Sequence, residues 1–367
     1  MGYIYDRPDW PAFRWDDAAL SAQLAAVRHH QGRLLGRMEA LGFPLRDEAI
    51  FRTLIQDAMK TSEIEGEILD REQVRSSLAR RLGIETAGLV PVDRHVDGVV
   101  TMLLDATRSF ERPLTMDRLQ GWNAALFPYG GIGRQPITVG AWRTDELGPM
   151  RVVSGRIGRE TVHFQAPPAE RIADEMTAFL RWFEDPSERI DPVLKAAVAH
   201  IWFVTIHPFD DGNGRIGRAI ADMALARSEG TSHRFYSLSA RLRVERNAYY
   251  ETLEATQKGD LDITCRLAWF LAVLDRALDD AEATLSAVLR KAAFWDRMAP
   301  MALNDRQKRL MNRLLDGFHG KLTTSKWATI AKCSQDTALR DIEGLIAFGI
   351  LAKEPGGGRS TSYGLVE

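Results

Sequence analysis

The sequence predicts a mainly α-helical protein with one β-hairpin and a C-terminal winged helix. Two observations favour this fold class. Apolar residues recur every three or four positions along most of the chain, which is the spacing of an amphipathic helix. Short β-type runs occur only at about 151–164 and near the C-terminal end. Because the chain has 367 residues, we expect two or three compact units rather than one.

The helical stretches are bounded by residues that end helices. Gly42 follows the first stretch, and Asp185-Pro186 follows the fourth. The expected helices cover residues 16–41, 47–66, 92–110, 169–183, 191–206, 215–228, 243–258 and 261–290. Residues 191–206 are apolar almost throughout, which predicts a buried helix. The hairpin is expected where two glycines separate Arg151–Val153 from Thr161–Phe164.

Residues 301–367 show the element order of a winged helix. Helical patterns at 304–318, 323–333 and 334–348 precede two β-like runs that are joined by Gly356-Gly357-Gly358. The region carries 10 Lys and Arg against 7 Asp and Glu, which is a mild excess.

The candidate recognition helix, at about 334–347, is acidic. It contains Asp336, Asp341 and Glu343 against Arg340 alone, although Arg359 on the wing adds a positive charge. Tight binding to a phosphate backbone scales with the number of phosphates neutralised. We therefore favour a protein-interaction or dimer-positioning role over DNA binding.

Composition narrows the class of protein. The apolar fraction of 45% and charged fraction of 27% are typical of a soluble globular protein. There is no apolar run of about 18 residues, so we expect no membrane span, and the N-terminus lacks the pattern of a secretory signal. Cys265 and Cys333 are too few for a disulfide framework or a cysteine zinc site, which favours a cytoplasmic location.

The segment from His207 to Arg218, His-Pro-Phe-Asp-Asp-Gly-Asn-Gly-Arg-Ile-Gly-Arg, has the features of a phosphate-binding loop. Gly212 and Gly214 around Asn213 allow positive φ angles and a close backbone approach to a ligand. A turn of this kind that opens a helix directs free N–H groups at an anion. Arg215 and Arg218 lie three residues apart and can grip adjacent phosphate oxygens.

Two further residues of the segment suit catalysis. Asp211 supplies a hard oxygen ligand for Mg²⁺ carried by a nucleotide. His207 titrates near neutrality and can accept a proton from a hydroxyl group. Taken singly, each residue is explained as well by loop shape, surface ion pairs or packing. Their joint order within twelve residues favours a catalytic phosphate site.

This segment matches, at every invariant position, the motif His-x-Phe-x-(Asp/Glu)-Gly-Asn-Gly-Arg-x-x-Arg, so the chain resembles the Fic family of protein AMP-transferases. The resemblance covers roughly residues 90–290 and implies a Fic-type helical core. It implies transfer of AMP from ATP to a Ser, Thr or Tyr hydroxyl of a target protein, including the chain itself. The hairpin at about 151–164 would be the flap that aligns the target by strand pairing.

The resemblance also implies a role for each residue of the motif. His207 would be the general base, and Asp211 would hold Mg²⁺ on the phosphates. The ATP phosphates would be bound by Gly212, Asn213, Gly214, Arg215 and Arg218, with Arg218 nearer the γ-phosphate. Phe209 would anchor the loop in the core. Tyr250 and Gln257 lie where the family contacts adenine, although an aromatic residue at helical spacing is as often part of the core.

Residues 61–66, Thr-Ser-Glu-Ile-Glu-Gly, match the family's inhibitory motif (Ser/Thr)-x-x-x-Glu-(Gly/Asn). Thr61 and Glu65 would share one face of the helix at about 47–66, ahead of Gly66. By resemblance, Glu65 would pair with Arg218 and deny it to the γ-phosphate. In some members the same glutamate supports removal of AMP, so the enzyme could run in both directions.

The resulting prediction divides the chain into an N-terminal helical region (1–90), a catalytic core (91–290) and a winged-helix-like domain (301–367). The competing class is a winged-helix DNA-binding regulator whose Fic core serves control. Related Fic-fold enzymes transfer phosphate, UMP or phosphocholine, and the base preference stays open. The target protein and the oligomeric state, a homodimer among the candidates, also stay open.

Overall fold

The computed structural model describes most of the chain, in two compact units that are treated separately below. The described residues are 2–40, 43–84, 89–130, 137–146, 148–156, 159–187, 189–315, 320–355 and 361–366. Contacts divide the chain into Met1–Ala283 and Thr284–Glu367, so the boundary falls within one long helix, α11. The domain bounds given above stay predictions.

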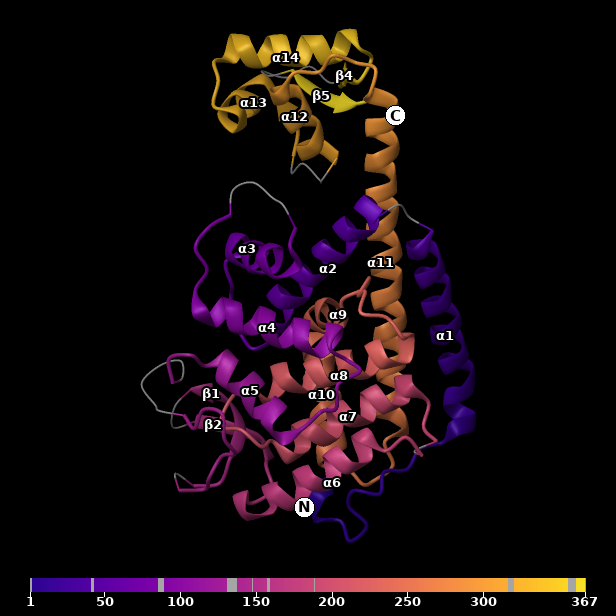
Figure 1. The fold of residues 1–367 in the computed structure, drawn as a ribbon, viewed down its shortest axis with the longest axis vertical. Coiled ribbons are helices and arrows are strands. Elements are labelled where there is room, and N and C mark those ends of the chain that lie inside the picture. The colour runs from indigo at the N-terminus through magenta and orange to yellow at the C-terminus, as the bar shows by residue number, and fades with distance from the viewer. Residues whose placement is uncertain are drawn as a thin grey trace. The chain divides into compact units, whose positions relative to one another are not determined.

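The first unit is helical apart from one hairpin, which confirms the predicted fold class (Figure 1). Its helices are α1 (Asp17–Glu39), α2 (Phe43–Ile64), α3 (Arg71–Leu82), α4 (Arg94–Arg108), α5 (Met116–Leu126), α6 (Ile172–Glu184), α7 (Pro192–Ile206), α8 (Asn213–Glu229), α9 (Leu238–Val244), α10 (Arg246–Gln257) and α11 (Thr264–Met298), with short 3-10 turns at Ile4–Asp6 and Ala169–Arg171. None of the described helices is both long enough and apolar enough to span a bilayer.

The structure differs from the sequence prediction at particular helices. The helices α3, α5 and α9 were not predicted. The helix expected at 243–258 corresponds to α10, and a break separates it from α9. The break lies at Glu245, whose carboxylate is bound by Arg241 (2.6 Å) and by Arg276 of α11 (2.6 and 2.8 Å). These charge-assisted contacts hold Glu245 at the end of α9, where the chain changes direction.

The core of the first unit is built around α7 and α8, which make the most extensive contact between its helices. Every residue of α7 from Ala196 to Ile206 is buried, as predicted for a helix that is apolar all round. Besides Thr205, the polar residue within this stretch is His200. It meets the hydroxyl of Tyr249 at 3.1 Å and Arg266 at 3.4 Å. The catalytic motif therefore starts from a helix that packing holds rigidly.

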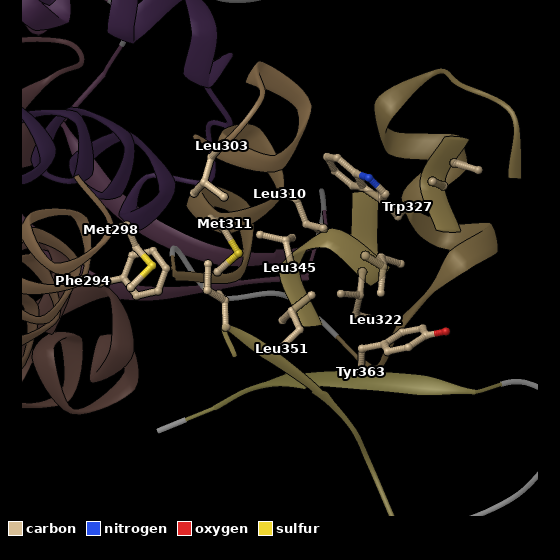
Figure 2. Close-up of a cluster of buried hydrophobic side chains, with 14 residues drawn as sticks. Phe294, Met298, Leu303, Leu310, Met311, Leu322, Trp327, Leu345, Leu351 and Tyr363 are labelled. Carbon is tan, nitrogen blue, oxygen red and sulfur yellow. The ribbon is translucent and has the colours of Figure 1, made fainter. Parts of the chain in front are cut away.

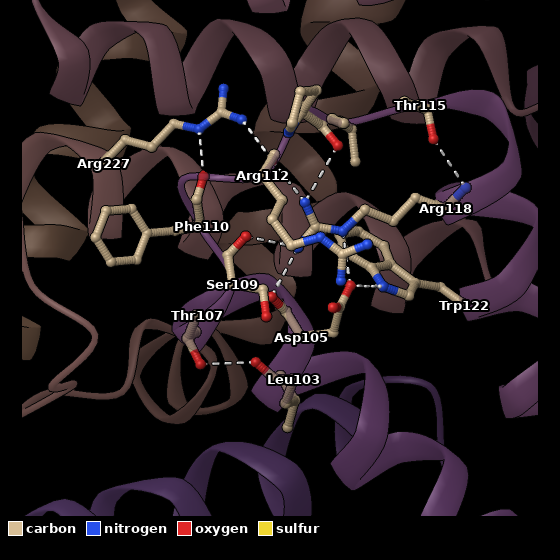
Figure 3. Close-up of polar contacts among 12 residues, drawn as sticks. Leu103, Asp105, Thr107, Ser109, Phe110, Arg112, Thr115, Arg118, Trp122 and Arg227 are labelled. Atoms are coloured by element: carbon tan, nitrogen blue, oxygen red, sulfur yellow. Dashed lines mark hydrogen bonds and ion pairs between the residues drawn. The ribbon is translucent and has the colours of Figure 1, made fainter.

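Polar contacts fasten α4 to α5 and to α8 (Figure 3). Arg118 of α5 binds the carboxylate of Asp105 at 2.7 Å, and the indole N–H of Trp122 donates to the same oxygen at 2.7 Å. Arg227, near the end of α8, donates to the carbonyl of Phe110 at 2.8 Å. Arg118 also donates to the backbone carbonyls of Asp105 and Ser109, at 2.8 and 3.0 Å, at the end of α4, where carbonyl groups lack partners within the helix.

The two helices α4 and α5 approach most closely at Gly98, where an added Cβ would overlap the carbonyl oxygen of Ala125. We expect Gly98→Ala to lower the free energy of unfolding by about 1–3 kcal/mol, because the backbones would have to separate. Gly121→Ala is the matched control. Gly121 is an exposed residue of α5, where an added Cβ meets nothing, so that change should stabilise by up to about 1 kcal/mol. Urea unfolding of both variants measures the difference, and equal effects would contradict this close approach.

The hairpin lies where the sequence predicts it. Strands β1 (Arg151–Arg156) and β2 (Arg159–Gln165) pair antiparallel, with a register shift between Val152 and Val153. Val153 and Val162 oppose each other and are 48% and 40% exposed. Each strand of a two-stranded ribbon is an edge strand, whose unpaired backbone groups can template a further strand.

The second unit contains α12 (Asp305–Leu315), α13 (Thr324–Ala331) and α14 (Gln335–Ala347), with strands β3 (Leu322–Thr323), β4 (Leu351–Lys353) and β5 (Ser362–Leu365) in the order β3-β5-β4. Leu310, Leu345 and Trp327 lie in its apolar core (Figure 2). The three helices and the last two strands follow the predicted order, whereas β3 was not predicted, and the assignment of the unit as a winged helix stays a prediction. The turn Gly356-Gly357-Gly358 and Arg359 lie outside the described residues.

One acid of α14 is not part of its solvent-facing surface. Asp341 is 3% exposed and receives Arg306 at 2.8 and 3.1 Å, together with Asn304 at 3.1 Å. Its charge is thus satisfied within the unit. The surface of α14 is less acidic than the sequence alone suggests, since of the three acids only Asp336 and Glu343 are exposed, beside Arg340.

Candidate active site

The loop between α7 and α8 holds the motif in a closed turn. The α7 helix ends at His207, which has left-handed dihedral angles (φ 53°, ψ 57°), a region in which histidine is enriched among non-glycine residues. The side chain of Asn213 then bonds both backbone groups of Phe209, at 3.0 and 2.7 Å. Asn213 and Phe209 are both buried. Asn213 therefore shapes the loop with its side chain, and only its backbone is left to meet a phosphate.

The loop delivers a helix N-terminus to the site. Gly212, with φ of 88°, is the N-cap of α8, so the N–H groups of Asn213, Gly214 and Arg215 have no carbonyl partner in the helix. Such groups and the helix dipole attract an anion. The anion found there belongs to the protein. A Cβ on Gly214 would overlap the carboxylate of Glu65, so this carboxylate lies directly against the first turn of α8.

His207 has the arrangement of a neutral base. Its Nδ1 lies 3.2 Å from the carbonyl oxygen of Val204, which can only accept, so Nδ1 carries the proton and Nε2 carries the lone pair. Burial of the ring lowers the pKa of His207 to about 4. The bond to Val204 opposes this shift, and the charge of Arg143 adds to it. His207 is therefore neutral at physiological pH and ready to accept a proton through Nε2.

The depressed pKa can be measured directly. We expect the imidazole signals of His207 to titrate near pH 4 in an NMR titration, well below the usual value of about 6.5 for histidine. The reason is the cost of placing a second charge in a buried site beside Arg143. A His207 midpoint above pH 6 would contradict this description of the base.

Arg143 supports His207 and was not predicted from the sequence. It is 2% exposed, its Nε donates to the carbonyl of His207 at 2.8 Å, and its Nη1 lies 2.8 Å from Asp145. Its backbone N–H donates to the carbonyl of Pro208. These bonds hold the backbone of the base in its left-handed conformation. The sequence offers no pattern for Arg143 beyond one arginine in an irregular segment.

Glu65 and Thr61, which are predicted to be inhibitory, both contact Arg218. Arg218 is 1% exposed, and its Nη1 lies 2.8 Å from Glu65 Oε1. Its Nε donates to the hydroxyl of Thr61, and its Nη2 donates to the carbonyl of Thr61, both at 2.9 Å. Gly66 follows with φ of 87°. In this state all three nitrogens of the Arg218 guanidinium are directed at α2 and its end.

The other motif arginine has partners that the sequence analysis did not predict. Arg215 Nη1 lies 3.0 Å from Glu67 Oε2, and its guanidinium lies 5.1 Å from the ring centre of Phe127. Glu67 also bonds Nε2 of His95, and Nδ1 of His95 lies 2.7 Å from the carbonyl oxygen of Leu126. No short sequence pattern predicts these contacts of Arg215, because Glu67, His95 and Leu126 lie in separate parts of the chain.

Asp211 fits a metal ion that arrives with a nucleotide. Its side chain is 52% exposed, and Oδ1 accepts the N–H of Gly212 and lies 3.7 Å from Arg215. Its backbone carbonyl accepts from Asn123, at 3.0 Å. Within the described ranges no group of three or more potential ligand side chains occurs. One open carboxylate suits Mg²⁺, which takes most of its remaining ligands from phosphates and water.

The two residues predicted to contact adenine lie differently. The hydroxyl of Tyr250 is 3.4 Å from the carbonyl oxygen of Ile64, the last residue of α2, and Arg246 donates to the same oxygen at 2.8 Å. Gln257 is 3% exposed, and its amide faces Val204 and Thr205 of α7 at 3.4 Å. In this state both side chains serve internal contacts, and their adenine contacts stay predictions.

The hairpin is pinned to α10 beside this site. His163 of β2 bonds the carboxylate of Glu254 through Nδ1 at 2.7 Å and the hydroxyl of Ser154 through Nε2 at 2.6 Å. The contact joins both strands of the hairpin to the helix that carries Tyr250. A target strand at this hairpin would meet a ribbon in a defined position.

Comparisons with known proteins agree with this geometry. Residues 113–225, which include the whole motif, match the Fic/DOC family, and residues 3–84 match a domain of unknown function (DUF4172). The chain as a whole is similar to the crystal structure of a Fic family protein from Desulfovibrio desulfuricans G20, with a TM-score of 0.54, 20% identity and coverage of 95% of this chain and 96% of that one. This likeness shows the Fic fold.

Curated proteins that match the Fic domain carry the names of nucleotide transferases. Protein adenylyltransferase fic-1 of Caenorhabditis elegans is 32% identical over 117 residues, which are 32% of this chain and 21% of that protein. A uridine 5'-monophosphate transferase of Xanthomonas campestris is 32% identical over 123 residues, which are 31% of this chain and 21% of that protein. The chain thus spans about a fifth of the length of these relatives.

Proposed function

We propose that the chain transfers AMP from ATP to a Ser, Thr or Tyr hydroxyl of a target protein, itself included. The observation that carries this proposal is the place of His207. A neutral base with a free Nε2 stands five residues before Gly212, the N-cap of a helix whose first two turns carry two arginines. A base beside an anion site is what in-line transfer to a hydroxyl requires.

In the proposed step, Nε2 of His207 takes the proton of the target hydroxyl as its oxygen attacks the α-phosphorus of ATP. The new oxygen–phosphorus bond forms while the bond from the α-phosphorus to the bridging oxygen breaks, and pyrophosphate leaves. The N–H groups at the start of α8, with Arg215 and Arg218, stabilise the negative charge of the phosphates. A Mg²⁺ ion held by Asp211 would neutralise charge on the phosphates.

We also propose that Glu65 inhibits the resting enzyme. Its carboxylate lies against Gly214 and is paired with Arg218, so it takes both the anion site and the arginine assigned to the γ-phosphate. The nucleotide must displace this carboxylate, or bind without Arg218 in an unproductive pose. Removal of AMP by the same glutamate is a second activity that this placement allows.

The target protein is proposed to pair with the hairpin at about 151–164, whose exposed edges accept a strand through backbone bonds. The second unit is proposed to be a winged helix that positions a protein partner or a second copy of the chain rather than DNA. We propose that the reaction takes place in the cytoplasm, and the two free cysteines, Cys265 and Cys333, support this proposal.

UMP transfer is the second candidate, because the Xanthomonas transferase is as similar as the worm protein. The purified chain should be incubated with lysate and ATP labelled at the α- or the γ-phosphate, or UTP labelled at the α-phosphate. AMP transfer predicts protein label from α-labelled ATP alone. Label from UTP alone would favour UMP transfer, and label from γ-labelled ATP would indicate a kinase. If neither the wild-type chain nor any variant described below transfers label to a protein, the proposal is wrong.

A further inference from the structure

The segment that carries Glu65 presents a second carboxylate to the motif. We propose that Glu67, held in place by His95, is a second inhibitory residue, which occupies Arg215 as Glu65 occupies Arg218. The inference rests on the proposed function, because it concerns the phosphate-binding arginines of that site. It adds that ATP must break two carboxylate contacts rather than one.

The contact between Glu67 and Arg215 is partly buried and has further partners, unlike a solvent-exposed surface ion pair. We call the Arg215–Glu67–His95 contact the latch. The side chain of Arg215 is 3% exposed and that of Glu67 is 22% exposed, and their atoms Nη1 and Oε2 lie 3.0 Å apart. Glu67 also bonds His95 of α4, whose other ring nitrogen bonds the carbonyl of Leu126 at the end of α5. Burial alone would raise the pKa of Glu67, but the bond and charge of His95 and the charge of Arg215 lower it, so Glu67 is ionised.

The backbone explains why the two acids reach different arginines. The N–H of Gly66 donates to the carbonyl of Glu63, and the N–H of Glu67 donates to the carbonyl of Ser62. With Gly66 in the left-handed region, this pair of bonds is a Schellman motif at the end of α2. The reversal of the chain at Gly66 turns Glu65 toward Arg218 and Glu67 toward Arg215.

The same motif couples the two contacts. Because Glu65 and Glu67 flank one rigid turn, a movement of the end of α2 withdraws both carboxylates from the site together. Arg246 and Tyr250 hold that end through the carbonyl of Ile64. The resting state thus neutralises both motif arginines with acids from one segment, and release of this segment frees both for phosphates.

A merely structural or positioning role for Glu67 makes the opposite prediction. If Glu67 orients Arg215 for the phosphates, its loss should slow transfer. If it competes with the phosphates, its loss should speed transfer and tighten ATP binding. The sign of the effect therefore decides between the two.

The test compares Glu67→Gln, Glu65→Gly, the double variant and Glu63→Gln, all in the full chain. Glu63 is the matched control, since it lies at the same helix end but pairs with Lys60 and Arg243, away from the motif. We expect Glu67→Gln to raise self-labelling by α-labelled ATP about threefold to thirtyfold, and the double variant to exceed either single variant. Calorimetry with Mg·ATP in a His207→Ala background should show tighter binding for Glu67→Gln and no change for Glu63→Gln.

Slower transfer or unchanged ATP affinity in Glu67→Gln would overturn the inference, even where Glu65→Gly is active. If no variant transfers label to any protein, the proposed function fails instead. Hydrogen exchange then tests separately whether Glu67 holds the end of α2 in place. The amides of Gly66 and Glu67 should then exchange faster in Glu67→Gln than in Glu63→Gln. Equal exchange in both variants would overturn the latch on its own.

Discussion

The Glu65→Gly variant is expected to transfer AMP about 10 to 100 times faster than the wild-type chain. Glu65 is the only described acid that pairs with Arg218, and Arg218 is almost completely buried against α2. A charge-assisted contact of this kind contributes on the order of 1.5–3 kcal/mol. Since about 1.4 kcal/mol corresponds to a factor of ten, its removal gives the stated range.

The measurement is the initial rate of self-labelling with α-labelled ATP at equal protein concentration. Glu63→Gln serves as the control, and thermal melting shows whether each variant keeps its fold. If Glu65→Gly is as slow as the wild type while its melting transition is unchanged, Glu65 is not a brake. A rise in both variants would point to a general loosening of α2, and the contact with Arg218 would then not be the cause.

A helix could be predicted from the sequence where the pattern of apolar residues within that one segment indicates it. The predicted helix at 191–206 agrees with α7 because a helix buried on every side must be apolar on every side. The α3 helix gave no such signal. Its buried residues are Val74 and Leu78 together with small ones, Ser76, Ser77 and Ala79, so burial there does not follow an apolar stripe. Small residues allow close packing, which depends on the neighbouring helix and not on the segment itself.

The residues of the candidate site also fall into those that the sequence predicted and those that it did not. The motif residues lie within twelve positions, and their spacing alone predicts a base and a phosphate cradle. Glu67, His95 and Arg143 come from separate parts of the chain and meet the motif only through the fold. The sequence places Glu67 directly after the inhibitory motif, whose last residue is Gly66. Knowing that Gly66 adopts a left-handed conformation was needed to see where Glu67 points.

Loss of the base should have the largest effect of all. We expect His207→Ala, made in the Glu65→Gly background, to lower the rate of AMP transfer by about 100- to 10,000-fold, because a positioned general base contributes that much. Binding of Mg·ATP should change little, since His207 contacts neither the start of α8 nor the two arginines within the described structure. Label transfer and calorimetry measure the two quantities separately.

Two further variants isolate the chemistry from the backbone. His207 has a φ of 53°, where alanine is strained, so His207→Ala could also disturb the loop. Asparagine tolerates this conformation and cannot act as a base at neutral pH. His207→Asn should therefore be as inactive as His207→Ala while it binds ATP normally, and His29→Ala on exposed α1 should be fully active. If His207→Asn keeps a tenth or more of the rate, the proton leaves the hydroxyl by another route, and Nε2 of His207 is not its acceptor.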